Sequence, residues 1–289
     1  MRRVLVTGAG SFIGGAFRAR MARFSGQYEV DAVSLRGDNW RALDFSAYDA
    51  VLHAAGIAHV KYRDGLRDEY MAVNRDLTVA VAEKAKADGC GQFLFLSSMI
   101  VYGPAAPAGR TRVVGPDTPP APENAYGESK LQAERGILAL ADDHFRVAVL
   151  RLPTVYGKGC KGNYKTLSHW AGKLPLFPDC AGARSVLYVE NLAEFIRLLV
   201  DDRAAGYFYP QNARYASAVD FMREIARARG EKIRFPRLFN PVLRLLGGAA
   251  FLRRALGGIA YEGAMSAYPR DYRVADFSES IRRTEESDG

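Results

Sequence analysis

The fold class follows from one stretch near the start of the chain, Val4-Leu5-Val6-Thr7-Gly8-Ala9-Gly10-Ser11-Phe12-Ile13-Gly14. Its β-branched and apolar first half predicts a buried parallel strand, and the glycines that follow predict a tight turn. Apolar side chains then recur at helical spacing through residue 17. A strand, a glycine turn and a helix leave the first N–H groups of the helix free to bind a pyrophosphate. We therefore expect a dinucleotide to contact the following residues of this turn: Gly8, Gly10, Ser11, Phe12, Ile13 and Gly14.

Composition and charge exclude several other classes of protein. The chain has 289 residues and a net charge of +8, with its basic residues spread along the sequence. Without a Lys/Arg block, nucleic-acid binding is not expected, whereas attraction for a small polyanion such as a nucleotide sugar is. No apolar run approaches the roughly 20 residues that cross a bilayer, so no transmembrane segment is expected. The three cysteines are odd in number and lack metal-ligand spacing. Without such spacing among Cys or His, no metal site is expected. Because the glycine-turn stretch begins at residue 4, we expect no signal peptide and a cytoplasmic protein.

Strand-like and helix-like segments alternate through roughly the first 200 residues, which predicts an α/β fold built on a doubly wound parallel Rossmann sheet. The predicted strands are Arg3–Thr7, Val30–Leu35, Arg41–Phe45, Ala50–His53, Gln92–Ser97 and Val147–Leu152. The predicted helices include Phe12–Phe24, Asp68–Asp88 and Ala125–Asp142. The link between residues 33 and 44 is too short for a helix and two loops, so the crossover helix expected there is reduced or missing.

The remaining segments predict a second, smaller lobe. Gly103–Glu123 is rich in Pro and Gly and predicts a surface loop over the site. Beyond Gly157 the pattern is irregular, whereas Arg184–Asp201 predicts a strand–helix return to the sheet. We therefore expect a Rossmann domain of residues 1–156 and about 184–210. Residues 157–183 and about 211–289 are expected to form a discontinuous substrate-binding lobe.

Three residues have the chemistry of a hydride-transfer enzyme. Tyr126 and Lys130 stand at i and i+4, on one face of a predicted helix. A nearby ammonium favours the phenolate, so Lys130 is expected to lower the pKa of Tyr126 and let it exchange a proton with a sugar hydroxyl. Ser98 follows a buried strand, where parallel sheets bind ligands, and is expected to hold the reacting oxygen.

Seven sequence blocks in order resemble the extended short-chain dehydrogenases/reductases, the group of nucleotide-sugar epimerases, dehydratases and 4-ketoreductases. The blocks are the glycine turn, Leu52-His53-Ala54-Ala55-Gly56, Asn74-Arg75-Asp76-Leu77-Thr78, the Ser98 loop, Tyr126/Lys130, Arg151-Leu152-Pro153-Thr154-Val155-Tyr156-Gly157, and Arg184-Ser185-Val186-Leu187-Tyr188-Val189-Glu190-Asn191. The resemblance covers nearly the whole chain. It implies a homodimer that pairs through a four-helix contact including Ala125–Asp142.

The resemblance also implies roles for individual residues. Ser98, Tyr126 and Lys130 would form the catalytic set. Asp44 and Phe45 would lie beside the adenine of the cofactor, and Ala54, Ala55 and Gly56 would lie at its nicotinamide. The other residues expected to contact the cofactor are Asn74, Ser97, Tyr126, Lys130 and Pro153. Asn74 would also support the catalytic helix. The substrate would meet Ser98, Met99, Tyr126, Thr154, Asn163 and Arg184, the last on its diphosphate. Thr154 stands where these enzymes often have an asparagine.

The end of the second predicted strand bears on the choice of cofactor. Enzymes specific for NAD place an acid there to bind the ribose hydroxyls, whereas this chain has Ser34, with Arg36 two residues later. A serine and an arginine can bind a 2′-phosphate that a carboxylate would repel. We therefore favour NADP over NAD, although Asp31 and Asp38 are nearby acids that could reverse this preference.

The residues after Ser98 distinguish between the activities found in this family. The 4,6-dehydratases carry an Asp-Glu pair there, and this chain has Met99 and Ile100, so elimination is not expected. Hydride chemistry at C4 of a UDP- or dTDP-hexose remains. We favour a 4-ketoreductase in surface-polysaccharide sugar biosynthesis. The alternatives are a UDP-glucose or UDP-N-acetylhexosamine 4-epimerase with tightly bound NAD and, less favoured, a catalytically silent NAD(P)-sensing binding protein.

Two further features have competing interpretations. His53 is expected to be a packed core residue rather than a base, and His59 lies in a loop from which it could contact substrate. The apolar, arginine-containing run Asn240–Gly258 predicts a pair of short helices in the small lobe, or else a surface that touches a membrane.

Overall fold

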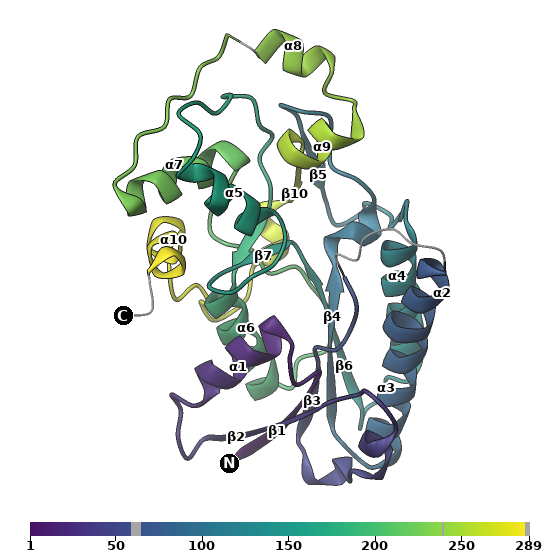
Figure 1. The fold of residues 1–289 in the computed structure, drawn as a ribbon. Helices are drawn as coiled ribbons and strands as arrows, with labels where there is room; N and C mark the ends of the chain where they lie inside the picture. Colours follow the sequence, from purple (N-terminus) through teal and green to yellow (C-terminus); the bar gives the residue numbers. More distant parts are fainter. Residues whose placement is uncertain (59–64, 239, 287–289) are drawn as a thin grey trace. The chain divides into compact units, whose positions relative to one another are not determined.

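The computed structural model describes residues 1–58, 65–238 and 240–286. The chain divides into two compact units (Figure 1). Unit 1 comprises residues 1–103, 119–152 and 192–209, and unit 2 comprises residues 104–118, 153–191 and 210–289.

Unit 1 is built on a parallel sheet of six strands in the order β2-β1-β3-β4-β6-β9. The strands are β1 (Arg2–Thr7), β2 (Tyr28–Val33), β3 (Ala50–His53), β4 (Gln92–Ser98), β6 (Arg146–Leu152) and β9 (Gly206–Phe208). Thr7 pairs with Val33 on one side and with His53 on the other, so three strands end together at the carboxyl edge. Residues in the middle of β1, β3, β4 and β6 are buried, which explains their continuous apolar runs. The predicted α/β fold with a parallel sheet is confirmed.

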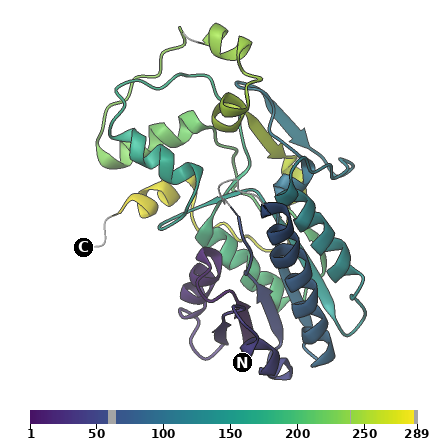
Figure 2. The same cartoon turned by 45° about the vertical axis from the view of Figure 1, so that its right-hand side comes forward.

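Helices cover both faces of this sheet (Figures 1 and 2). On one face lie α1 (Phe12–Met21) and α6 (Val189–Asp201), joined by an ion pair of 2.9 Å between Arg20 and Glu194. On the other lie α3 (Leu77–Ala87) and α4 (Ala125–Leu138). The second face encloses a core rich in buried aromatic side chains, namely Trp40, Phe45, Phe93, Phe95 and Phe145. These layers hold the carboxyl edge of the sheet in place.

The segment between β2 and β3 corrects one predicted strand. Residues 41–45 form no strand; the chain there makes two 3₁₀ turns, η1 (Asn39–Ala42) and η2 (Phe45–Ala47). The Asp44 side chain accepts a hydrogen bond from the Ser46 N–H at 2.8 Å and so caps η2, which favours a turn over an extended chain. The predicted reduction of the crossover helix is confirmed.

The predicted helix Asp68–Asp88 is interrupted in the structure. It consists of α2 (Leu66–Tyr70), a π-helical segment η3 (Met71–Asp76) and α3. The predicted helix Ala125–Asp142 ends as α4 at Leu138, and the Asp142 carboxylate accepts the N–H groups of His144 and Phe145 in the turn that follows.

Unit 2 contains two small parallel sheets of two strands each. β5 (Thr111–Val114) pairs with β10 (Gly258–Tyr261), and β7 (Thr154–Tyr156) pairs with β8 (Val186–Tyr188). Two expectations are therefore corrected. The predicted loop Gly103–Glu123 contains a strand, whose preceding residue Arg110 accepts the Gly258 N–H at 2.8 Å. The strand within Arg184–Asp201 pairs with β7 instead of the six-stranded sheet, which is completed by β9.

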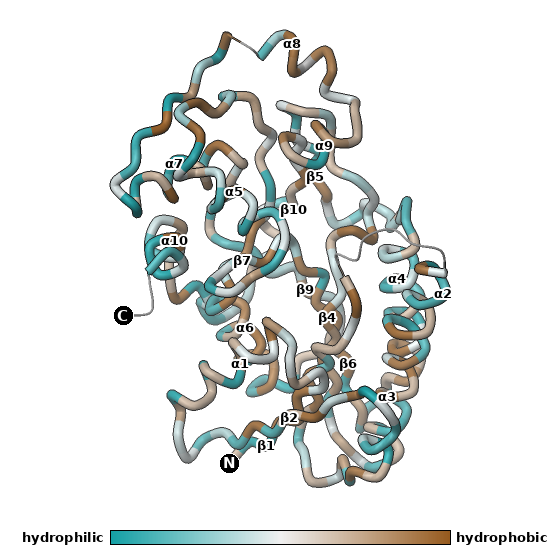
Figure 3. Tube along the Cα trace, in the orientation of Figure 1, coloured by the Kyte–Doolittle hydropathy of each residue, from teal (hydrophilic) through white to brown (hydrophobic). Residues whose placement is uncertain are grey.

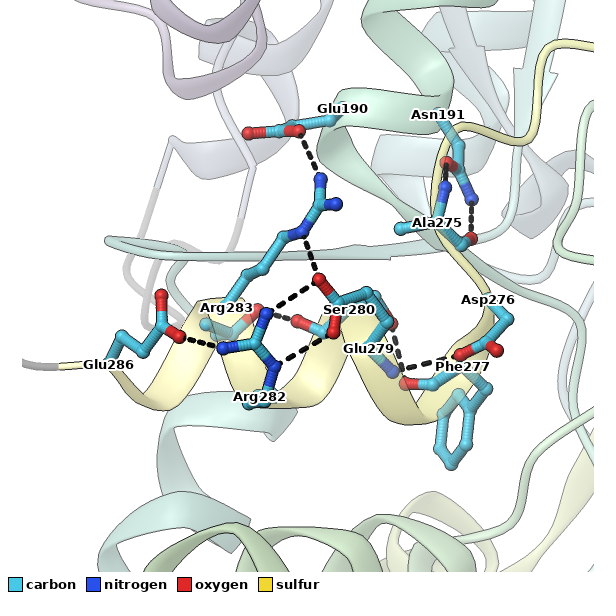
Figure 4. A network of polar contacts seen from close by, with 11 residues as sticks. Glu190, Asn191, Ala275, Asp276, Phe277, Glu279, Ser280, Arg282, Arg283 and Glu286 are labelled. Atoms are coloured by element: carbon cyan, nitrogen blue, oxygen red, sulfur yellow. Dashed lines mark hydrogen bonds and ion pairs between the residues drawn. The ribbon is translucent and has the colours of Figure 1, made fainter.

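The helices of unit 2 are short, and polar contacts hold the last of them. They are α5 (Asn163–Ala171), α7 (Ala218–Arg229), α8 (Asn240–Leu245), α9 (Ala250–Leu256) and α10 (Phe277–Glu285). Arg283 of α10 lies 3.2 Å from Glu190, and the Asn191 amide forms two hydrogen bonds of 3.0 Å with the backbone of Ala275. Figure 4 shows both contacts. Among the helices of the described ranges, none is long and apolar enough to cross a membrane.

Candidate functional site

The glycine turn between β1 and α1 has the shape that a bound pyrophosphate requires. Gly8 has φ of +85°, and a Cβ placed on it would lie 2.8 Å from the Ala55 backbone nitrogen. A Cβ on Gly14 would lie 2.8 Å from the Val6 side chain, so glycine lets α1 pack closely on β1. These are the two tight positions of a dinucleotide-binding turn. Gly10 faces open space and has no such steric requirement.

Ser11 caps α1 in place of a glycine. Its Oγ accepts a hydrogen bond from the Gly14 N–H at 3.2 Å, and its own hydroxyl hydrogen can still be donated. The N–H groups of Phe12 and Ile13 lie in the first turn of the helix, where the helix itself supplies no acceptor. The turn, with its open side at Gly10, therefore fits a phosphate group.

Tyr126 and Ser98 meet at the carboxyl end of β4. Ser98 is the last residue of β4, and Tyr126 is the second residue of α4, a helix whose N-cap Asn124 accepts the Gly127 N–H at 2.8 Å. A hydrogen bond from Ser98 lowers the pKa of Tyr126, but the loss of hydration around the phenol outweighs it and raises this pKa to about 12. The expected lowering by Lys130 is not found, and Tyr126 is protonated at neutral pH.

Lys130 lies one turn further along α4 and is buried. Its Nζ donates to the Leu96 carbonyl oxygen at 2.9 Å and lies 4.6 Å from the centre of the Phe95 ring. Burial lowers the pKa of this ammonium to about 8, although the charge of Glu134 acts in the opposite direction. A Cβ on Gly56 would come within 3.4 Å of Nζ, so the loop after β3 passes directly beside the lysine.

Asn74 connects this loop to α4. The residue lies in the π-helical segment η3 and is fully buried. Its Oδ1 accepts the Ile57 N–H at 2.9 Å, and its Nδ2 donates to the Ile57 carbonyl at 3.0 Å and to Ser129 Oγ at 3.3 Å. Ser129 in turn donates to the Tyr126 carbonyl at 2.8 Å. Asn74 thus contacts α4, as its expected supporting role requires. We call Asn74, Ser98, Tyr126 and Lys130 the proposed catalytic corner.

A buried ion pair beneath the corner was not anticipated from the sequence. Glu134 is fully buried, and its carboxylate binds the Arg151 guanidinium at 2.6 Å. Arg151 also donates to the Tyr102 hydroxyl at 2.7 Å. Ser97, expected to contact the cofactor, donates its hydroxyl to Glu134. Glu134 follows Lys130 by four residues, and this spacing was the only signal in the sequence.

Tyr70 is a second residue that the sequence did not single out. It ends α2, and its ring centre lies 5.6 Å from that of Tyr126, at an angle of 47°. Only 7% of Tyr70 is exposed, so it forms part of the wall behind the Tyr126 ring. On the same side, Arg67 of α2 pairs with Glu128 of α4 at 2.7 Å.

The end of β2 presents the predicted ribose contacts on the surface. Ser34 and Arg36 are exposed, and the Arg36 N–H donates to Ser34 Oγ at 3.2 Å. The two nearby acids have other partners, because Asp31 accepts the Tyr48 hydroxyl at 2.8 Å and Asp38 pairs with Arg41 at 3.1 Å.

The pair predicted to lie beside adenine is divided between surface and core. Asp44 is exposed, whereas Phe45 is fully buried, with the Lys84 ammonium 5.0 Å from its ring centre. Of the loop after β3, Ala54 and Ala55 are partly exposed, and the Ala54 N–H donates to the Thr7 carbonyl at 3.1 Å. His53 is fully buried between the hydroxyls of Thr7 and Thr78, and burial lowers its pKa to about 3, which confirms its packed role. His59 lies outside the described residues.

The remaining substrate candidates have different surroundings. Met99, the first residue of the 3₁₀ turn η4 (Met99–Tyr102) in unit 1, is buried. In unit 2, Thr154 and Asn163 are exposed and Pro153 is buried. Arg184 donates to the carbonyls of Arg254 and Gly257, each at 2.7 Å, at the end of α9.

The family is decided by a match of residues 4–208 to the model of the NAD dependent epimerase/dehydratase family. The chain belongs to this family. UDP-glucose 4-epimerase of Vibrio cholerae is 32% identical over 188 residues, covering 62% of this chain and 56% of that protein. UDP-2-acetamido-2,6-beta-L-arabino-hexul-4-ose reductase of Pseudomonas aeruginosa is 29% identical over 170 residues, covering 57% and 38%. The chain spans about half or less of the length of these curated relatives.

The fold agrees with this assignment. The crystal structure of a dTDP-4-dehydrorhamnose reductase from Clostridium acetobutylicum superposes with a TM-score of 0.74 at 17% identity, covering 98% of both chains. The prediction of an extended short-chain dehydrogenase/reductase, made from seven sequence blocks, is confirmed.

Proposed function

We propose that this family member is an NADP-dependent 4-ketoreductase of a UDP- or dTDP-linked hexose. The observation that carries the proposal is the end of β2. Ser34 and Arg36 are exposed there, while Asp31 and Asp38 are bound to Tyr48 and Arg41. Because neither acid is paired with Arg36, this arginine can bind the 2′-phosphate of NADP. NADPH is the exchangeable reductant that a reductase uses, so this site favours reduction.

When bound, the nicotinamide cofactor supplies the hydride that adds to C4 of the keto sugar. The proton for the carbonyl oxygen comes from the Tyr126 hydroxyl. A tyrosine of ordinary pKa is already protonated at neutral pH, and burial raises the pKa of Tyr126 further, to about 12. Ser98, which hydrogen-bonds Tyr126, orients the same sugar oxygen. Hydride and proton together convert the C4 carbonyl to a secondary alcohol.

We also propose that residues of unit 2 bind the substrate. Thr154, Asn163 and Arg184 would contact the nucleotide sugar, and Arg184 would take the diphosphate. Met99 and Ile100 supply no acid for removing a hydroxyl as water, so the proposed reaction ends at reduction. A homodimer through α4 is the assembly that we propose from the resemblance.

A 4-epimerase is the second candidate, and the Vibrio cholerae relative favours it. The same corner would serve, but Tyr126 would first have to remove a proton from the C4 hydroxyl. That step requires a phenolate, which the raised pKa of Tyr126 disfavours before a cofactor binds. A silent binding protein is disfavoured because Ser98, Tyr126 and Lys130 are all present.

Mass spectrometry of the nucleotide released from freshly purified, denatured protein tests the proposal, together with NADH and NADPH titrations. We expect little retained nucleotide, tighter binding of NADPH, and oxidation of NADPH when 4-keto UDP- or dTDP-sugars are added. Tyr126→Phe is the matched control, which should bind NADPH without oxidising it. Tightly retained NAD with interconversion of UDP-hexoses would overturn the reductase in favour of the epimerase.

A further inference from the structure

Large hydrophobic side chains are concentrated on one exposed part of unit 2. The exposed fractions are 81% for Leu238, 58% for Val242, 85% for Leu245, 56% for Leu246 and 79% for Phe251. All five lie within the 14 residues that contain α8 and the start of α9. Figure 3 shows this stretch as a run of hydrophobic segments. We call these five residues the basic apolar surface, because the segment that contains them has basic residues and no acidic ones.

The charged residues within this sequence segment are all basic. From Lys232 to Tyr261 the sequence contains six cationic residues and no Asp or Glu. The cations are Lys232, Arg234, Arg237, Arg244, Arg253 and Arg254. Single exposed apolar residues are ordinary, but five such residues within one short basic segment indicate an interaction site.

The surface is held by neighbouring parts of unit 2. Arg237 pairs with Asp179 at 2.7 Å, and the Asn240 amide donates to the Asp179 carbonyl at 2.8 Å. Beside it lies an apolar hollow of about 320 Å³, lined by Leu176, Pro178, Pro236, Val242 and Leu243. These contacts hold Arg237 and Asn240, while side chains such as Leu245 and Phe251 remain exposed.

We propose that the basic apolar surface binds an anionic lipid bilayer. Apolar side chains flanked by arginines are the composition of segments that lie in the interface plane, with cations on the lipid phosphates and apolar groups among the upper acyl carbons. α8 and α9 have 6 and 7 residues, too few to span a bilayer. The contact is therefore peripheral and reversible.

Vesicle co-sedimentation of the full chain tests this proposal. Phosphatidylcholine vesicles with and without phosphatidylglycerol are compared at low salt and at high salt. We expect binding only when phosphatidylglycerol is present, and a large loss of binding at high salt because the arginine contribution is screened. The double variant Leu245→Ser/Phe251→Ser should lower the bound fraction about tenfold or more. Arg253→Gln/Arg254→Gln should weaken binding at low salt.

Val113→Ser is the matched control, because Val113 is 58% exposed on β5 of the same unit but lies outside the surface. It should bind vesicles as the unmodified protein does. Circular dichroism melting and NADPH binding report whether each variant is folded. Absence of vesicle binding at low salt, or binding that Leu245→Ser/Phe251→Ser leaves unchanged, would overturn the proposal. So would sedimentation of the unmodified protein as a dimer that this variant converts to monomer without vesicle binding, since the surface would then be a subunit contact.

Discussion

The proposed catalytic corner of unit 1 and the substrate candidates of unit 2 differ in how their side chains are held. In the corner, Asn74 and Lys130 are buried and bonded to backbone groups. In unit 2, Thr154 and Asn163 are exposed, at the first positions of β7 and α5. The groups that we propose for the chemistry thus lie in rigid, buried geometry, whereas the groups that would select a particular sugar lie on surfaces that can vary without disturbing a core.

The comparison is tested most strongly by removing the phenol of the corner. Tyr126→Phe should lower kcat by about 10³-fold, because the proton donor is lost while the ring stays in place. Thr154→Ala should instead change KM by a few-fold with kcat nearly constant, since a surface contact contributes to binding alone. Steady-state NADPH oxidation with a 4-keto sugar measures both. Equal losses of kcat in the two variants would contradict the division of roles.

The next largest predicted effect is a loss of stability when the buried Glu134–Arg151 ion pair is broken. Glu134→Ala leaves the Arg151 guanidinium buried without its carboxylate and should lower the free energy of unfolding by about 3–5 kcal/mol. Glu128→Ala is the matched control on the same helix, because its partner Arg67 is exposed; this change should cost about 1 kcal/mol or less. Urea unfolding measures both, and similar losses would show that burial does not distinguish the two pairs.

Lys130 predicts a dependence of stability on pH. Its pKa is about 8 in the folded protein and 10.5 ordinarily, so the unfolded chain binds the extra proton between these values. The free energy of unfolding therefore rises as pH increases from about 8 to 10.5. This gain in stability is lost again as pH falls back through that window to about 8. Lys130→Met should remove this slope and be the more stable protein at pH 7, by about 2 kcal/mol.

Urea unfolding of both proteins at several pH values between 7 and 10 checks this prediction. Lys84→Met serves as a control, because Lys84 is paired with Asp88 at 2.7 Å near the surface. A difference between the unmodified protein and Lys130→Met that is constant with pH would contradict the lowered pKa.

The end of β2 predicts the smallest effect, on cofactor choice. Ser34→Asp places a carboxylate where a 2′-phosphate would lie and should weaken NADPH binding about tenfold while improving NADH binding. Asp38→Asn is the control, since Asp38 already pairs with Arg41 and should contribute little to repulsion. Fluorescence titration with both cofactors measures the ratio; an unchanged ratio in Ser34→Asp would contradict the proposed ribose site.

Local sequence patterns predicted the parts of the molecule that depend on short-range physics. The run Ala50–His53 is a strand with the predicted bounds, because its continuous apolar residues can be buried only inside a sheet. The predicted strand at 41–45 was wrong, because the Asp44 cap competes with extended backbone and the pattern alone could not weigh the two. The π-helical segment at Asn74 was also missed, since the i to i+5 spacing has no signal in the order of apolar residues.

By itself, the sequence determined the glycine turn and the i, i+4 spacing of Tyr126 and Lys130, because each depends on residues close together in the chain. It also determined the family and the parallel α/β sheet, because the order of short local patterns along the chain is enough to identify both. The tertiary structure alone decided the pairing of Glu134 with Arg151, the approach of Tyr70 to Tyr126, and the raised pKa of Tyr126. These depend on which distant residues meet and how much water they exclude. Although Lys130 lies one helical turn from Tyr126 in sequence, it is the burial of the phenol that sets the Tyr126 pKa, and burial is a property of the folded chain.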